Sequence, residues 1–139
     1  MFHVLKTETK TEKRRKVAIS DDGGLTWSEP REDEALIEPV CQASILRYRW
    51  PAGFNTGEIL FSNPASTKRE RMTVRLSADQ GKTWPAARVL YPKTAAYSSL
   101  VALPGEQVGC LYERDGYKEI VFARFGLGWL AEGRDHAKP

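Results

Sequence analysis

The octapeptide SDDGGLTW at Ser20–Trp27 recurs as SADQGKTW at Ser77–Trp84, and both copies fit the pattern S-x-D-x-G-x-T-W. The two starting serines are 57 residues apart. In such a pattern the Ser and Asp side chains can accept hydrogen bonds from backbone N–H groups inside a tight turn. Gly24 and Gly81 can adopt the positive φ that a chain reversal requires. The tryptophan can pack back onto the neighbouring strands. We therefore interpret the repeat as a structural turn, not as an acid or a metal site.

The segments around both copies have the composition of β-strands. They are short, rich in Val, Ile, Leu, Tyr and Phe, and separated by turn residues. No segment keeps a helical period for three turns. One strand after the first copy and three before the second would make a four-stranded unit, which is typical of a propeller blade. The predicted fold is all-β, with about two to three four-stranded antiparallel blades. The predicted strands are 16–20, 43–50, 57–63, 72–77, 88–91, 97–103, 107–113 and 117–125.

The length of the chain limits how many blades it can hold. At about 57 residues per unit, 139 residues give about 2.4 units, whereas closed propellers use about 4–8 blades. Repeat units bury their faces only against neighbours. We therefore expect further blades, either from an N-terminal part of a longer protein or from another chain. The predicted organisation is a polar lead-in at 1–13, blades at 14–130 and a polar tail at 131–139.

The bulk composition excludes several classes of protein. A net charge of +3 and 41% hydrophobic residues are typical of a globular domain, and the basic run at 10–15 does not indicate nucleic-acid binding. No apolar run approaches the length of a membrane span or a signal peptide. If Met1 is the true start, we expect a cytoplasmic chain. Cys41 and Cys110 lie in apolar runs and are predicted to be buried free thiols. Neither they nor the two histidines indicate a metal or cofactor site.

Several further stretches, in their order along the chain, carry a family resemblance. They are LIEPVCQASILR (36–47), LFSNPA (60–65), MTVRLS (72–77), AYSSL (96–100), GCLYE (109–113) and IVFA (120–123). With the two S-x-D-x-G-x-T-W turns, which are Asp boxes (BNR repeats), they resemble exo-α-sialidases over roughly residues 14–130. The resemblance implies a partial six-bladed β-propeller with the site at its axis and the Asp boxes at its periphery. It also implies cleavage of terminal sialic acid from glycoconjugates.

The resemblance implies roles for four residues. Tyr97 in AYSSL matches the catalytic tyrosine, and Arg69 matches the third arginine of a triad that binds the substrate carboxylate, with Arg71 as the competing position. Glu113 in CLYE matches the glutamate that holds the first arginine of that triad. Gln42 in CQAS is a weaker match to a pocket-lining residue. No metal or cofactor is implied.

The chemistry of sialic acid explains these residue types. Its anomeric carbon carries a carboxylate, which would repel a carboxylate nucleophile, and sialidases use a tyrosine instead. A free phenol has a pKa of about 10 and needs a base beside it, which in the family is a glutamate. Planar guanidinium groups bind both oxygens of a carboxylate and stay charged. An aspartate serves as the acid/base on the leaving side in the family.

The chain departs from the family upstream of the first Asp box. The first and second triad arginines, the acid/base aspartate and the base glutamate would all precede it, and Lys6–Arg15 (KTETKTEKRR) holds no counterpart. Arg14 and Arg15 are too close to the Asp box to serve. We therefore expect the chain to be inactive alone. A non-catalytic glycan-binding or interaction module is the alternative, and an Asp-box propeller with an unrelated ligand is a third reading.

Overall fold

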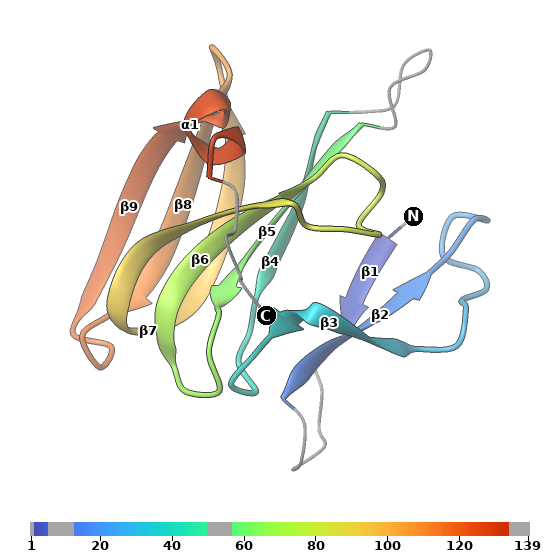
Figure 1. Ribbon diagram of the computed structural model, residues 1–139, viewed down its shortest axis with the longest axis horizontal. Helices are drawn as coiled ribbons and strands as arrows, with labels where there is room; N and C mark the ends of the chain where they lie inside the picture. The colour runs from blue at the N-terminus through green and yellow to red at the C-terminus, as the bar shows by residue number, and fades with distance from the viewer. Residues whose placement is uncertain (1, 6–12, 50–56, 134–139) are drawn as a thin grey trace.

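The structure of the protein, a computed structural model, describes residues 2–5, 13–49 and 57–133. These residues form nine strands and one short helix (Figure 1). The strands and the helix are β1 (Phe2–Leu5), β2 (Arg14–Ile19), β3 (Arg31–Ile37), β4 (Ser44–Arg49), β5 (Glu58–Pro64), β6 (Glu70–Ser77), β7 (Ala86–Leu103), β8 (Gln107–Arg114), β9 (Glu119–Gly126) and α1 (Leu127–Ala131). In the described residues, no helix has the length and apolar character needed to cross a lipid bilayer.

The strands form two antiparallel sheets. The smaller has the order β1-β2-β3, and the larger has the order β4-β5-β6-β7-β8-β9 and curls strongly (Figure 1). Strand β7 is shared, because residues 86–94 pair with β6 whereas residues 95–103 pair with β8. Strands β4 to β7 therefore form one four-stranded unit, and the second part of β7 begins the next. The predicted all-β, partial β-propeller fold is confirmed, with neighbouring units joined through one continuous strand.

The two Asp boxes occupy the same place in successive units. The first connects β2 to β3, and the second connects β6 to β7. In each turn the aspartate, Asp22 or Asp79, accepts hydrogen bonds from a hydroxyl and from two backbone N–H groups further along the turn. Gly24 and Gly81 have φ of 97° and 79°, as the turn requires. The structural interpretation of the repeat matches this geometry.

The predicted strands are present, with three differences. Segments 88–91 and 97–103 were predicted as separate strands, but both belong to β7. The one strand expected after the first Asp box was given no range, and it is β3, whose sequence REDEALI begins with four charged residues. Strand β1 lies inside the predicted lead-in and pairs with β2. Of the predicted tail, residues 134–139 lie outside the described residues.

Two apolar clusters hold the strands together. The larger fills the inside of the curled sheet, where alternating side chains of β5 to β9 meet, together with Leu127 and Leu130 of α1. The smaller joins the two sheets, and its buried members are Val17, Leu36, Ile59, Phe61 and Trp84. Alternation along each strand places these side chains on one face. The inside of the curled sheet is thus packed, and the predicted site residues lie at its edge.

Candidate functional site

The structure brings the four predicted site residues to the beginning of the second unit. Tyr97 lies on the second part of β7, and Glu113 lies near the end of β8. Arg69 directly precedes β6, and Gln42 lies between β3 and β4. The guanidinium carbon of Arg69 is 5.7 Å from the centroid of the Tyr97 ring. Residues up to 71 positions apart in the sequence therefore share one corner of the molecule.

A β-bulge presents Tyr97. The pairing of β7 with β8 shifts register between Ala95 and Ser98, so that Ala96 and Tyr97 lie opposite Glu113 alone. The backbone N–H of Tyr97 donates a 3.1 Å hydrogen bond to Oε2 of Glu113, which replaces the missing ladder bond. The Tyr97 side chain is 47% exposed. The bulge therefore points the phenol outward, where a ligand can reach it.

Glu113 supports the nucleophile candidate in this structure. Its observed contact is with the Tyr97 backbone, and among the described residues it forms no ion pair. The predicted role of holding the first triad arginine stays a prediction. The two functions are compatible, because a carboxylate has two oxygens and about four acceptor positions.

Gln42 closes the other side of the bulge. Its Nε2 donates to the Ser98 carbonyl at 3.0 Å, and its Oε1 accepts from the Ser98 N–H at 3.0 Å. The amide therefore acts as an additional strand partner for β7. Gln42, Tyr97 and Glu113 line an open hollow of about 370 Å³ together with residues of β8 and β9. The role of Gln42 in lining a substrate pocket stays a prediction.

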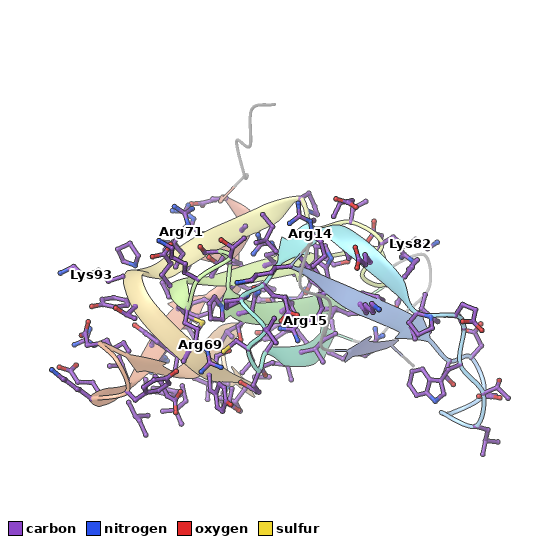
Figure 2. The ribbon with its side chains drawn as sticks, turned by 90° about the horizontal axis from the view of Figure 1, so that it is seen from below. Arg14, Arg15, Arg69, Arg71, Lys82 and Lys93 are labelled. Carbon is purple, nitrogen blue, oxygen red and sulfur yellow. The ribbon has the colours of Figure 1, made fainter. Side chains whose placement is uncertain are left out.

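Arg69 is held by its backbone and by its side chain. Its carbonyl accepts a 2.9 Å hydrogen bond from the N–H of Ala95 on β7. Its Nη1 donates a 2.5 Å hydrogen bond to the phenol oxygen of Tyr117, which raises the pKa of Arg69 above its usual value. The competing candidate, Arg71, is exposed and has a φ of 61° at a register shift. Figure 2 shows the two side chains extending away from each other, and only Arg69 faces Tyr97.

Tyr117 is a site residue that the sequence reasoning missed. It lies in the turn between β8 and β9, whereas the sequence predicted it as the first residue of the strand 117–125. Composition gave no signal, because an aromatic residue after Asp-Gly commonly begins the next strand. Its role depends on the long-range approach of Arg69.

Arg14 and Arg15 are bound to groups other than the four predicted site residues. Arg14 forms an ion pair with the exposed Glu34 at 3.4 Å. Arg15 is buried and forms a 2.7 Å ion pair with the fully buried Glu38, and it also donates to the Cys41 carbonyl at 2.9 Å. Burial lowers the pKa of Arg15, although Glu38 opposes the shift. Residues 6–12 of the candidate upstream region lie outside the described residues.

The described residues offer no group for a metal or for activating the phenol. No cluster of three His, Cys, Asp or Glu residues among them could hold a metal ion. No carboxylate in residues 13–49 and 57–133 is hydrogen-bonded to the Tyr97 hydroxyl, since Glu113 contacts the backbone. Cys41 and Cys110 are buried and free, as predicted. Burial raises the pKa of both thiols, that of Cys110 to about 12, which disfavours their reactive thiolate forms.

Comparison with known sequences gives consistent matches. The model of the BNR repeat-like domain family matches residues 3–110. A sialidase of Micromonospora viridifaciens is 43% identical over 120 residues, which cover 84% of this chain and 18% of that protein. A sialidase of Bacteroides fragilis is 38% identical over 105 residues, covering 71% and 19% respectively. An exo-alpha-sialidase of Aspergillus fumigatus is 33% identical over 119 residues, covering 73% and 29%.

Solved structures match the fold. The Hadza microbial sialidase Hz136 superposes with a TM-score of 0.72 at 30% identity and covers 93% of this chain and 26% of that one. A leech intramolecular trans-sialidase, solved with 2,7-anhydro-Neu5Ac, superposes with a TM-score of 0.78 at 22% identity, a likeness of fold alone. It covers 94% of this chain and 22% of that one. The chain thus spans between about a fifth and three tenths of these relatives.

Proposed function

Since the chain belongs to the exo-α-sialidase family with BNR repeats, we propose that it holds part of a sialidase-type active site. In this proposal Arg69 binds the carboxylate of a terminal sialic acid, and Tyr97 is the nucleophile of a retaining glycosidase. The substrate is a sialylated glycan, and the reaction releases its terminal sugar.

The state of Arg69 supports carboxylate binding. One guanidinium nitrogen is engaged by Tyr117, a neutral acceptor, and no carboxylate is paired with Arg69 among the described residues. The remaining N–H groups can therefore form two parallel hydrogen bonds with a ligand carboxylate. Because the side chain is only partly exposed, this interaction is stronger than a solvated surface pair.

The position of Tyr97 supports attack on the anomeric carbon. In sialic acid the carboxylate is bonded to that carbon, so a sugar bound to Arg69 brings it close to the adjacent phenol. In the proposed step the phenol oxygen forms a bond to the anomeric carbon as the bond to the leaving oxygen breaks. The phenol proton passes to a base, and an acid protonates the leaving oxygen. Water then releases the sugar from the tyrosine.

The observation that carries the proposal is the 5.7 Å approach of the Arg69 guanidinium to the Tyr97 ring, beside an open hollow of about 370 Å³. It is tested by titrating the chain with 2-deoxy-2,3-didehydro-N-acetylneuraminic acid and following ligand signals by NMR. We expect Arg69→Met to weaken binding at least about 10-fold, in line with the loss of a charged, bidentate hydrogen-bonded pair.

Arg71→Met is the matched control. It removes the same positive charge at a position two residues from Arg69, and the Arg71 side chain extends away from Arg69 (Figure 2). It should bind as the unchanged chain does. Equal loss in both variants, or no loss in Arg69→Met, would contradict the assignment of Arg69. A fluorogenic sialoside adds a test of Tyr97, since any turnover that survives Tyr97→Phe cannot use this residue as nucleophile.

The second candidate function is glycan binding without catalysis. It is favoured by one observation, the lack of a carboxylate hydrogen-bonded to the Tyr97 phenol in the described part of the chain. Binding of the sugar without turnover, in the chain alone and together with the complementary part of a relative, would select this function. Turnover that appears when the complementary part is added would select the enzyme.

A further inference from the structure

Arg69 lies between two tyrosines, and the function proposed above uses only one of them. The ring of Tyr97 lies 5.7 Å from its guanidinium carbon, and the phenol oxygen of Tyr117 accepts from its Nη1 at 2.5 Å. Both tyrosines are partly exposed, Tyr117 by 58%. An exposed aromatic ring contributes little to the stability of the fold. The notable interaction of Tyr117 is therefore its hydrogen bond to Arg69.

The backbone around Tyr117 is strained. Asp115, Gly116 and Tyr117 have successive φ values of 51°, 68° and 69°. The left-handed region is unfavourable for any residue with a β-carbon, and a bulky aromatic residue there is an outlier. Strain of this kind persists only where the surroundings impose it, and it is found most often at functional sites. In this turn its effect is to direct the Tyr117 phenol toward Arg69.

The turn is fixed from both sides. Tyr91 donates from its hydroxyl to Oδ1 of Asp115 at 2.5 Å, and the N–H of Asp115 donates to the Thr94 carbonyl at 3.0 Å. The guanidinium of Arg114 bonds to Glu119 on β9. The turn is therefore tied to β7 and β9 independently of Arg69. Because the contacts that hold the turn do not involve Arg69, Tyr117 can hold the Arg69 guanidinium in one position.

We infer that Tyr117 is a positioning residue that sets the rotation of the Arg69 guanidinium, and thereby selects sugars that carry a carboxylate. This inference rests on the proposed function of Arg69. A phenol oxygen is suited to the task because it orients the guanidinium without cancelling its charge. A carboxylate in the same place would compete with the substrate carboxylate for the same N–H groups. Phenylalanine would keep the ring but leave the guanidinium free to rotate.

The test compares Tyr117→Phe with Tyr48→Phe in the full chain. Tyr48 is the matched control, because its ring lies 5.9 Å from the guanidinium carbon of another arginine, Arg49, on strand β4. The first readout is the affinity for 2-deoxy-2,3-didehydro-N-acetylneuraminic acid and for its methyl ester, which lacks the charge. We expect Tyr117→Phe to weaken binding of the acid about 5- to 10-fold, as expected for a hydrogen bond to a charged group, and to leave the ester unchanged.

The second readout needs no ligand. The NMR signals of the Arg69 guanidinium report how fast it rotates, and we expect faster rotation in Tyr117→Phe but not in Tyr48→Phe. Unchanged rotation in Tyr117→Phe would overturn the inference, as would equal weakening of acid and ester. If Arg69→Met leaves binding of the acid intact while rotation still responds to Tyr117→Phe, the proposed function fails and the positioning contact stands.

Discussion

The two Asp boxes have the same turn but different tryptophans. In both turns the serine hydroxyl donates to the aspartate at 2.8 Å, and the aspartate accepts from the threonine N–H at 2.9 Å. Trp27 of the first box is 42% exposed, and its Nε1 donates back to the carbonyl of Gly24 in its own turn. Trp84 of the second box is 6% exposed and contacts the other sheet.

Trp84 joins the two sheets of the molecule. Its Nε1 donates to Oδ2 of Asp33 on β3 at 3.2 Å, and its ring lies 5.7 Å from that of Phe61 on β5. The conformation of the turn is thus determined by its own eight residues, whereas the burial of the tryptophan depends on which strands lie beside the turn. Trp27 has no such buried position, since its side chain is exposed. The same motif therefore leaves its tryptophan exposed in one copy and buries it between the two sheets in the other.

The largest difference should appear when each tryptophan is removed. We expect Trp84→Ala to lower the free energy of unfolding by about 3–5 kcal/mol, because it empties a buried site between two sheets. Trp27→Ala should cost less than about 1 kcal/mol, as for an exposed side chain. Urea unfolding followed by circular dichroism measures both. Equal losses would show that the burial of Trp84 between the sheets adds nothing to its contribution.

A smaller effect should come from the acceptor of the Trp84 hydrogen bond. Asp33→Ala removes a buried partner of Trp84 and of the Ala35 N–H, and we expect a loss of about 1–3 kcal/mol. Glu34→Ala is the control. Glu34 is the exposed residue next to Asp33 and forms an ion pair with Arg14, so its removal should change stability by less than about 0.5 kcal/mol.

A double-mutant cycle sharpens the same comparison. Trp84→Phe keeps an aromatic ring but removes the N–H, so it should couple with Asp33→Ala by about 1 kcal/mol. Trp27→Phe should show no coupling with Asp33→Ala. Coupling in the second pair would contradict the separation of the two boxes.

The smallest effect is a pH dependence that both boxes share. The side-chain and backbone donors of Thr26, then the hydroxyl of Ser20, hold the pKa of Asp22 well below its usual value. At Asp79, burial acts in the opposite direction, but the hydrogen bonds from Thr83, Ser77 and Lys82 outweigh it and the pKa is also lowered. Both carboxylates are thus more acidic when folded.

A lowered folded pKa stabilises the protein fully above the unfolded value of about 3.9 and loses that contribution as the pH falls below it. We therefore expect the thermal midpoint to fall between pH 5 and pH 2, and less steeply in Asp22→Asn and Asp79→Asn. Thermal melts at closely spaced pH values measure the slopes. If both variants kept the slope of the unchanged chain, other carboxylates would account for it.

Local patterns predicted much of this fold because they act over a few residues. The Asp-box turns, the apolar run of β5 and the apolar alternation of β6 can be read from the sequence alone. The bounds of β3 could not, because its charged start Arg31–Glu34 indicates a loop until Trp84 supplies a partner for Asp33. The continuity of β7 was not predicted, because Pro92 and Lys93 lie between the predicted strands 88–91 and 97–103 and proline lacks the N–H that a strand donates. Both residues are exposed and lie between Tyr91 and Thr94, where pairing with β6 is irregular and a missing N–H costs little.

The site residues also divide into those that the sequence could predict and those that depend on how the strands pair. The approach of Arg69 to Tyr97 was expected from the family resemblance, and the geometry places them together. The bulge that presents Tyr97 and the use of Glu113 to satisfy its N–H were not expected, because they depend on the register of β7 against β8. Tyr117 could not be found either, since its left-handed backbone and its contact with Arg69 exist only once the strands have paired.

Strand β7 has a consequence for how the molecule unfolds. Because this single strand supplies backbone hydrogen bonds first to β6 and then to β8, its two halves cannot exchange with solvent as independent segments. Opening one half pulls on the bulge in the middle, and with it on the tyrosine that the bulge presents. We therefore expect the two blades to unfold as one cooperative unit, and the geometry around Tyr97 to persist as long as that unit does.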